Sequence, residues 1–275
     1  MYEVINRDKD LGNKIIQSHS DMMFAGIVFG NNPGRVWVDN LENPSSALVW
    51  SDGLECFQFM GCESNQALYK ELKTFIENTI INFLKEKKLD YFEFSADTEE
   101  WYPLIYNVLS DREIKESWQQ LYKSNANSQG NDKVIIPKPY CLHQIDRSFI
   151  SSIKNGEMVS NPEFLIDYIE QFWGSVENYL NYGYGYGAID EGKIVSFAIT
   201  SFLYNTTFTI GVETLEQHRR KGLASTLVNI LLKELYSKGY NIWWDCMDSN
   251  IASQRTTKST GLIFYHKYKV CWFNL

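Results

Sequence analysis

The sequence of 275 residues predicts a two-lobed α+β fold with a mixed sheet. Both halves of the chain contain short apolar runs separated by turn residues, which predicts antiparallel strands. Each half also contains a long amphipathic helix placed between strands in the sequence. In the second half, a strand, a helix and another strand follow in the order of a right-handed crossover, which makes those two strands parallel.

The composition is that of a globular protein with an excess of acidic groups. Hydrophobic residues make up 44% and charged residues 22% of the chain, so we expect a packed core and exclude bulk disorder. The formal net charge is −8, which argues against nucleic acid as a partner. An acidic protein attracts cations, and a cationic small molecule is therefore the easier partner.

Five cysteines occur without a Cys-x-x-Cys pair: Cys56, Cys62, Cys141, Cys246 and Cys271. Their number and spacing predict neither a disulfide framework nor a zinc site, and we expect no metal. Residues 1–8 are polar and mixed in charge, unlike a secretory signal, and no apolar run approaches the roughly 18 residues that span a bilayer. We expect a cytoplasmic protein without a membrane partner, as a monomer or homodimer.

The first lobe is expected over residues 1–123. Four apolar runs predict strands: residues 24–29, 35–38, 47–50 and 54–59. An Asp-Gly turn between the last two runs is a hairpin signal. Apolar side chains recur every three or four residues over 68–84 and predict a long helix. A strand over 91–94 and a short helix over 99–108 complete this lobe.

Residues 124–132 are small or polar and predict either a linker or a long hairpin loop, and we place the domain boundary there. The second lobe, residues 133–275, begins with an extended segment whose two prolines oppose a helix. Asn161-Pro162-Glu163 predicts a helix start. The further elements expected are strands at 182–189, 194–200 and 207–214, a helix at 223–238, a strand at 242–246 and a helix from residue 250.

The segment between the third of these strands and the following helix carries the chemistry. It contains Arg219, Arg220 and Lys221 directly before Gly222. A loop that begins a helix exposes unpaired backbone N–H groups at the positive end of the helix dipole. Gly222 allows the backbone to approach a ligand oxygen closely, and the small side chain of Ala224 leaves room for that approach. The segment predicts a diphosphate site, with a basic, solvated helix start as the alternative.

Arg219-x-x-Gly222-x-Ala224 resembles the acyl-CoA loop of the GCN5-related N-acetyltransferase (GNAT) superfamily, which reads Q/R-x-x-G-x-G/A. The order of elements is also similar: a meander, the loop, a helix, a parallel strand and a helix that begins at Asn250. Finer matches resemble the subfamily that includes the zwittermicin A resistance acetyltransferase: Thr214, residues 218–225, residues 244–246, Asn250, Ser253 and Gly261. The strong resemblance covers residues 182–262, and the first lobe resembles a degenerate GNAT-like half.

The resemblance implies acetyl-CoA (coenzyme A) as co-substrate. The strand–helix junction of the first lobe, residues 61–65, has no such anion loop, so we expect one coenzyme site. In this superfamily the two central parallel strands splay apart, and pantetheine lies between them. Backbone groups of Ile210, Gly211 and Val212 would bind pantetheine, and the N–H of Val212 would polarise the thioester carbonyl. The other coenzyme contacts implied are Arg219, Arg220, Lys221, Gly222, Leu223, Ala224, Asn250 and Ser253.

Direct acetyl transfer needs a neutral amine, although a free amine with a pKa of about 10 is protonated at pH 7. Glu213, at the end of its strand, is the first candidate for the base, with a solvated carboxylate as the alternative. Asp245 on the neighbouring strand is the second candidate, and a structural role suits it better. The superfamily commonly has a Tyr acid seven residues after the Asn. That position is Thr257 here, so Tyr265 or Tyr268 would protonate the leaving thiolate, or solvent would.

Other residues carry weaker signals. Tyr182, Tyr184 and Tyr186 alternate with glycines and share one face of a predicted strand. Their rings would either form the floor of an acceptor pocket, with cation–π contacts, or pack under the helix at 162–173. Cys246 is expected to be a small core residue rather than a nucleophile.

The sequence thus predicts an N-acetyltransferase that moves an acetyl group from acetyl-CoA directly to a primary amine of a small molecule. We expect the acceptor in the cleft between the lobes, and the subfamily resemblance makes an aminated antibiotic or metabolite a candidate. Two alternatives stay open at this stage. One is an acyl-CoA-binding sensor or scaffold without turnover, and the other is an acyltransferase that uses a longer acyl chain or a protein amine.

Overall fold

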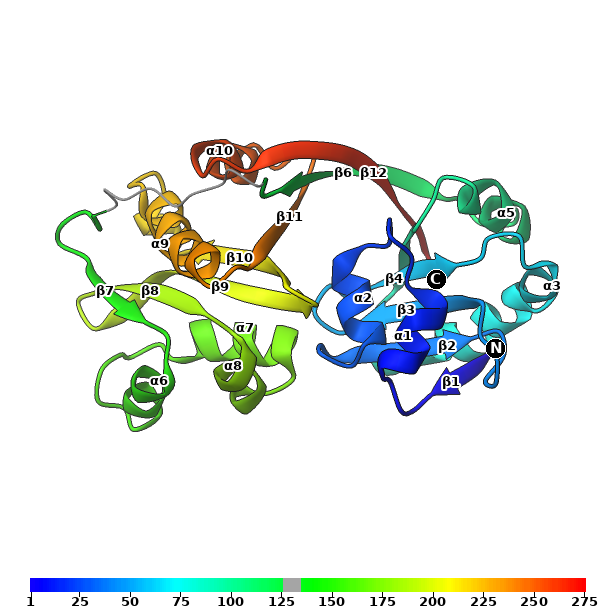
Figure 1. The fold of residues 1–275 in the computed structure, drawn as a ribbon, viewed down its shortest axis with the longest axis horizontal. Helices are drawn as coiled ribbons and strands as arrows, with labels where there is room; N and C mark the ends of the chain where they lie inside the picture. The colour runs from blue at the N-terminus through cyan, green and yellow to red at the C-terminus, as the bar shows by residue number, and fades with distance from the viewer. Residues whose placement is uncertain (126–134) are drawn as a thin grey trace. The chain divides into compact units, whose positions relative to one another are not determined.

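The computed structural model of the chain describes residues 1–125 and 135–275 and contains two compact units (Figure 1). Unit 1 comprises Met1–Gln119 and Lys267–Leu275, and unit 2 comprises Gln120–His266. Strands and helices occur in both units, and parallel as well as antiparallel pairs are present in each. The predicted α+β fold class with a mixed sheet is therefore confirmed.

Unit 1 contains five strands that begin and end within it: β1 (Tyr2–Val4), β2 (Gly34–Val38), β3 (Ser46–Ser51), β4 (Cys56–Gly61) and β5 (Tyr91–Ala96). Its described helical segments are α1 (Lys9–Ile15), α2 (Met22–Val28), α3 (Gln66–Phe75), the π-helical turn η1 (Ile76–Ile80), α4 (Ile81–Glu86) and α5 (Trp101–Val108). β2, β3 and β4 form an antiparallel meander, and β4 pairs with β5 in parallel. The helical segment from α3 to α4 is the crossover between the two parallel strands.

The strand predicted at residues 24–29 is wrong, because most of these residues belong to α2. The Asp21 carboxylate accepts a hydrogen bond from the backbone N–H of Met23 (2.7 Å) and caps the helix. All seven residues of α2 are buried. Apolar side chains therefore cover the whole helix surface, and the sequence lacks the polar face that separates a surface helix from a strand.

Unit 2 contains the strands β7 (Cys141–Gln144), β8 (Gly185–Asp190), β9 (Lys193–Tyr204), β10 (Thr207–Thr214) and β11 (Asn241–Met247). Its described helices are α6 (Arg147–Lys154), α7 (Glu163–Trp173), α8 (Val176–Tyr182), the 3₁₀ turn η2 (Glu216–His218), α9 (Leu223–Ser237) and α10 (Ile251–Ser259). The predicted meander is confirmed, since β8, β9 and β10 pair antiparallel in sequence order. Figure 1 shows α9 on one face of this sheet and α7 on the other.

The predicted parallel pair in unit 2 is also confirmed. β10 and β11 pair only over three positions, Thr207–Thr209 with Asn241–Trp243. Both strands continue beyond this point, to Thr214 and Met247, without further pairing to each other among the described residues. The two strands therefore separate towards their carboxyl ends, as the resemblance to the GNAT superfamily implies.

Two strands pass from one unit into the other. β6 (Lys115–Lys123) follows β5 in the sequence but lies next to β11, where the N–H of Ser124 donates to the carbonyl of Ile242 (3.0 Å). β12 (Ile263–Asn274) follows β11 but pairs antiparallel with β5. The strand orders of the units are therefore equivalent, β1-β2-β3-β4-β5-β12 and β7-β8-β9-β10-β11-β6.

This exchange of sixth strands differs from the division expected from the sequence. The boundaries 1–123 and 133–275 assign the last nine residues to the second lobe, whereas Lys267–Leu275 group with unit 1 because β12 pairs with β5. The segment 124–132, expected to be a linker or a hairpin loop, lies outside the described residues from 126 onwards.

Each unit has its own apolar core. The core of unit 1 is rich in aromatic rings, with the Phe57 centroid 4.8 Å from those of both Trp50 and Phe92. In unit 2, buried leucines of α9 pack on the sheet, including Leu227 and Leu231. No helix in the described ranges is both long and apolar enough to cross a membrane.

Candidate functional site

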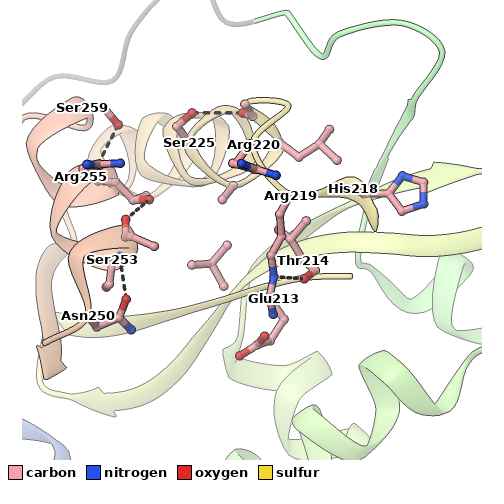
Figure 2. Close-up of a pocket in the computed structure, with 16 residues that line it drawn as sticks. Glu213, Thr214, His218, Arg219, Arg220, Ser225, Asn250, Ser253, Arg255 and Ser259 are labelled. Carbon is pink, nitrogen blue, oxygen red and sulfur yellow. Dashed lines mark hydrogen bonds between the residues drawn. The ribbon is translucent and has the colours of Figure 1, made fainter. Parts of the chain in front are cut away.

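A pocket of about 760 Å³ lies in unit 2, beside the part of β10 that no longer pairs with β11 (Figure 2). Three segments form its walls: the end of β10, the loop before α9 with the first turn of that helix, and α10 with its cap. The lining residues are Val212, Glu213, Thr214, His218, Arg219, Arg220, Gly222, Leu223, Ala224, Ser225, Asn250, Ala252, Ser253, Arg255, Thr256 and Ser259.

The loop before α9 presents a series of backbone N–H groups. Arg220 and Gly222 both have left-handed backbone conformations, with φ of 60° and 79°. No atom of the described residues accepts a hydrogen bond from the backbone N–H groups of Arg220 to Ser225. The first hydrogen bond of the helix is donated by the Thr226 N–H to the Gly222 carbonyl (3.0 Å). Left-handed residues at a helix start turn consecutive N–H groups into an anion-binding concavity.

Side chains of the loop hold it against the sheet. Arg219 Nε donates to the carbonyl of Thr214 (3.1 Å), which ties the loop to the end of β10. His218 Nδ1 lies 3.1 Å from the hydroxyl of Tyr140. Lys221 is not among the lining residues, and its Nζ is 5.9 Å from the Tyr140 ring centroid. Of the three cations expected at the loop, Arg219 and Arg220 thus line the pocket and Lys221 does not.

The end of β10 is shaped by a close contact at Gly211. A Cβ at this position would lie 1.5 Å from the Tyr168 hydroxyl, so only glycine fits beside this ring. The same hydroxyl lies 3.0 Å from Ser201 Oγ, and burial raises the pKa of Tyr168 well above its usual range. Val212 follows and lines the pocket, whereas Gly211 and Ile210 do not.

Glu213 is the one carboxylate among the lining residues. Its side chain is reached by solvent, yet the neighbouring protein atoms displace enough water to raise the pKa of Glu213 above its ordinary value. The positive charge of Arg219 acts in the opposite direction and offsets part of this shift. A carboxylate with a raised pKa accepts a proton more readily near neutral pH, which suits a general base.

The second wall begins with the cap of α10. Asn250 Oδ1 accepts a hydrogen bond from the N–H of Ser253 (3.0 Å), and Ser253 Oγ accepts one from Trp244 Nε1 (2.8 Å). Both expected residues line the pocket. Thr257 faces away from it, because its side chain is buried and its hydroxyl donates to the carbonyl of Gln254 (2.8 Å). The position of the superfamily's usual Tyr acid therefore contributes no proton donor to this pocket.

The other expected acid and base residues lie outside the pocket lining. Trp243 Nε1 donates to Asp245 Oδ2 (2.5 Å), which is a structural contact. Tyr265 is 58% exposed, and the Lys123 Nζ lies 3.7 Å from its ring centroid. Tyr268 belongs to unit 1. Val212 and Glu213 therefore line the pocket together with residues of the loop, whereas Asp245, Tyr265 and Tyr268 are not among its lining residues.

The tyrosine series differs from the expectation. Tyr182 is the last residue of α8 rather than part of the strand, and it is 57% exposed. The Tyr184 ring contacts Phe208 and Tyr240, with centroids 5.8 Å away in both cases. Burial and Glu234 of α9 raise the pKa of Tyr186 to about 12. Tyr184 and Tyr186 thus pack on the α9 side of the sheet, not under α7, and none of the three tyrosines lines the pocket.

Several lining residues were not singled out in the sequence. On α10 these are Ala252, Arg255, Thr256 and Ser259. Their spacing of three or four residues places them on one helix face with Ser253. The sequence alone shows this spacing, so the four residues could have been predicted once Asn250 was identified as the helix start. Among the described residues, no group of three or more His, Cys, Asp or Glu side chains could hold a metal ion.

The sequence of the chain is similar to those of known proteins over most of its length. A family described as GNAT acetyltransferase matches residues 13–271. A Bacillus subtilis (strain 168) protein named uncharacterized N-acetyltransferase YdfB is 21% identical over 238 residues, which cover 86% of this chain and 85% of that protein.

Solved structures resemble the fold of the chain. A GCN5-related N-acetyltransferase-like protein from Streptococcus suis 89/1591 has a TM-score of 0.62 at 19% identity, covering 88% of each chain. A tandem GNAT protein from the clavulanic acid biosynthesis pathway has a TM-score of 0.62 at 9% identity, covering 99% of this chain and 97% of the other. The second likeness spans both units and agrees with their equivalent strand orders.

Proposed function

The chain belongs to the GNAT acetyltransferase family, and from this premise we propose that it transfers an acetyl group from acetyl-CoA to a primary amine of a small molecule. The observation that carries the proposal is the composition of one pocket. Its loop wall carries two arginines and backbone N–H groups for which the described residues supply no acceptor, and a carboxylate with a raised pKa lies at the end of β10.

The donor set of the pocket fits coenzyme A. The N–H groups from Arg220 to Ser225, together with the Arg219 and Arg220 side chains, suit a diphosphate, which carries negative charge on several oxygens. The separated ends of β10 and β11 leave strand backbone beyond Thr209 that suits the amide groups of pantetheine. The N–H of Val212 would then donate to the thioester carbonyl oxygen and stabilise the negative charge that develops on it.

In the proposed reaction, Glu213 accepts a proton from the ammonium group of the acceptor. The neutral amine attacks the thioester carbon and its N–C bond forms. The nitrogen then loses its second proton to solvent, and the C–S bond breaks to release the thiolate of coenzyme A. No tyrosine is among the lining residues, so we assign the protonation of the thiolate to solvent. The products are an N-acetylated amine and free coenzyme A, without an acyl-enzyme.

The class of acceptor is proposed from charge. A net charge of −8 and the Glu213 carboxylate favour a cationic amine over an anionic acceptor. The resemblance to the subfamily of the zwittermicin A resistance acetyltransferase adds aminated antibiotics to the candidates. We further propose that the protein acts in the cytoplasm, as a monomer or homodimer.

Calorimetric titration with acetyl-CoA tests the coenzyme site. Gly222→Glu places a negative charge beside the loop N–H groups, and we expect at least a hundredfold loss of affinity through repulsion of the diphosphate. Gly239→Glu is the matched control. Both glycines have a left-handed backbone, φ +79° and +80°, and a Cβ at either position meets no atom within 4 Å, but Gly239 follows α9 and does not line the pocket. Equal losses in both variants, or no binding to the unmodified protein, would contradict the proposal.

Turnover is tested with acetyl-CoA and a panel of polyamines and aminated antibiotics, with release of free thiol as the measurement. Thiol release that depends on one of the amines, with a matching N-acetylated product, supports the proposal. Intact acetyl-CoA binding with no release across a broad panel would favour an acyl-CoA-binding sensor. The replacement of the usual Tyr acid by the buried Thr257 is the observation that keeps this alternative worth testing.

A further inference from the structure

The pocket has a second cationic wall, formed by Arg255 of α10. Figure 2 shows Arg255 and Ser259 at one end of the pocket, across from Ser225 and Arg220 at the start of α9. Glu213 and Asn250 lie at the opposite end. Cations therefore gather on two facing walls at the end away from the proposed acetyl-transfer site.

Arg255 has donors available for a ligand. Its guanidinium group makes no hydrogen bond or ion pair with any residue in the ranges 1–125 and 135–275. Arg219 differs, because its Nε already donates to the Thr214 carbonyl. A guanidinium group has five N–H donors in a planar fork that matches two oxygens of a phosphate.

The hydroxyl groups next to Arg255 cannot take over this role. Ser259 Oγ donates to the carbonyl of Thr256 (2.8 Å), and Thr256 Oγ1 donates to the carbonyl of Ala252 (3.1 Å). Each hydroxyl has a single O–H, so both are already used within α10. At this end of the α10 wall, an anionic group of a ligand would be met by Arg255.

Cations on two facing walls suit a ligand with two separate anionic groups. The loop wall, with its N–H groups, suits a diphosphate, and Arg255 on the opposite wall suits an additional phosphate. Coenzyme A carries both, because its ribose has a 3′-phosphate in addition to the diphosphate. We propose that Arg255 binds the 3′-phosphate of coenzyme A and so makes the pocket select the phosphorylated coenzyme. This inference rests on the proposed function, which supplies coenzyme A as the ligand.

Dephospho-coenzyme A is the probe, since it lacks only the 3′-phosphate. Affinities of coenzyme A and dephospho-coenzyme A are measured by calorimetry at one ionic strength for the unmodified protein, Arg255→Gln and Lys258→Gln. Lys258 is the matched control, because it is an exposed cation on the same helix that does not line the pocket. We expect a preference of roughly tenfold for coenzyme A in the unmodified protein, the effect of one charged hydrogen-bonded contact. Arg255→Gln should lose this preference with little change in dephospho-coenzyme A affinity, and Lys258→Gln should retain it.

The remaining outcomes separate this inference from the proposed function. Equal affinities in the unmodified protein would overturn the role of Arg255 while leaving the coenzyme site in place. So would an Arg255→Gln variant that weakens both ligands by the same factor, because Arg255 would then act on the diphosphate. Failure of the unmodified protein to bind either ligand would overturn the coenzyme site itself. Arg255→Lys keeps the charge and should keep part of the preference, which guards against misinterpreting a folding defect in Arg255→Gln.

Discussion

The segment from β4 to β5 in unit 1 and the segment from β10 to β11 in unit 2 have the same topology and different chemistry. Each follows an antiparallel meander, and each joins two parallel strands through a helical crossover. Each first strand has a glycine two residues beyond its last parallel pair, Gly61 after Phe59 and Gly211 after Thr209. The pocket, and the backbone N–H groups for which the described residues supply no acceptor, lie beside β10 in unit 2.

The two segments differ first at the gap between the parallel strands. In unit 1, the pairing is extended by the N–H of Asp97, which donates to the Phe59 carbonyl (3.0 Å). The Asp97 carboxylate then accepts hydrogen bonds from the Gly61 N–H (3.3 Å) and from Ser20 Oγ (2.7 Å). In unit 2 the equivalent position is Trp244, whose Nε1 donates to Ser253 instead. One carboxylate thus joins the strand ends in unit 1, whereas the equivalent residue in unit 2 is a tryptophan that bonds to α10.

The loops differ in what satisfies their N–H groups. In unit 1, Asn65 Oδ1 accepts from the N–H of Leu68 (3.2 Å), and the N–H of Cys62 donates to the Ser45 carbonyl (2.8 Å). In unit 2, Gly222 occupies the cap position of α9, and no side chain in the described part of the chain caps the helix start. The two loops thus have equivalent places in the topology, and they differ in whether nearby groups accept hydrogen bonds from their backbone N–H groups.

The greatest difference between the two segments is expected at a pair of equivalent carboxylates. Glu213 and Glu63 each lie four residues beyond the last parallel pair of their strand. Glu213→Gln removes the proposed base, and we expect kcat/KM to fall by about 10²- to 10⁴-fold. Glu63→Gln should leave kcat/KM unchanged, because unit 1 has no proposed role in proton transfer. Steady-state kinetics with the amine found in the panel measures both.

The pH dependence of kcat/KM tests the same role of Glu213. A base acts when deprotonated, so kcat/KM of the unmodified protein should rise with pH through the pKa of Glu213. Burial raises that pKa, and the rise should therefore lie above the pH range of an ordinary glutamate. Glu213→Gln should lack this limb of the profile. A limb that persists in the variant would assign it to another group.

The next largest effect concerns the two glycines. Gly211→Ala would place a Cβ 1.5 Å from the Tyr168 hydroxyl, and Gly61→Ala would place one 2.3 Å from the Ser45 carbonyl oxygen at a φ of +86°. We expect each change to lower the free energy of unfolding by about 3 kcal/mol, measured by urea titration. Tyr168→Ala should recover part of the loss in Gly211→Ala, because there the obstacle is a side chain. No such recovery by a side-chain change is expected for Gly61→Ala, whose obstacle is backbone, and equal recoveries would contradict this distinction.

The sequence predicted the elements whose signals are local. The strands of both meanders and the helix α9 follow from alternation, turns and periodicity, and the loop before α9 follows from its glycine and cations. The exchange of β6 and β12 between units could not be predicted, because strand partners are chosen by contacts between distant residues. The same applies to Asp97, which in the sequence is one acidic residue after a strand and in the fold joins β4, β5 and Ser20.

A smaller effect is expected at Asp97. Asp97→Ala leaves the donors of Gly61, Ser20 and Gln58 without their acceptor, and we expect a loss of about 2 kcal/mol in the free energy of unfolding. Asp111→Ala removes an exposed ion pair to Lys73 and should cost much less than Asp97→Ala, because solvent screens that pair. Urea titrations of both variants measure the difference. Two equal losses would mean that the link between β4 and β5 adds nothing to the stability of unit 1.

Asp97 should also give unit 1 a pH-dependent stability. Burial raises the pKa of Asp97 in the folded state, although its hydrogen bonds partly oppose this. The folded state then binds more protons than the unfolded state between the two pKa values. The free energy of unfolding should therefore fall as pH rises from the ordinary aspartate range, about 3.9, through the folded-state pKa. Asp97→Ala should flatten this dependence.

The smallest effect separates a helix cap from a coenzyme contact. Asn65 and Asn250 cap α3 and α10 through their side-chain oxygens, and each change to Ala should cost about 1 kcal/mol of stability. Asn250 also lines the pocket, so the coenzyme contact proposed for it would be either direct or through the position of α10. Asn250→Ser keeps a cap but loses the amide. If Asn250→Ser retains acetyl-CoA affinity while Asn250→Ala weakens it, the cap is what the pocket needs. A loss of affinity in both, with stability retained in Asn250→Ser, would identify the amide as a direct contact.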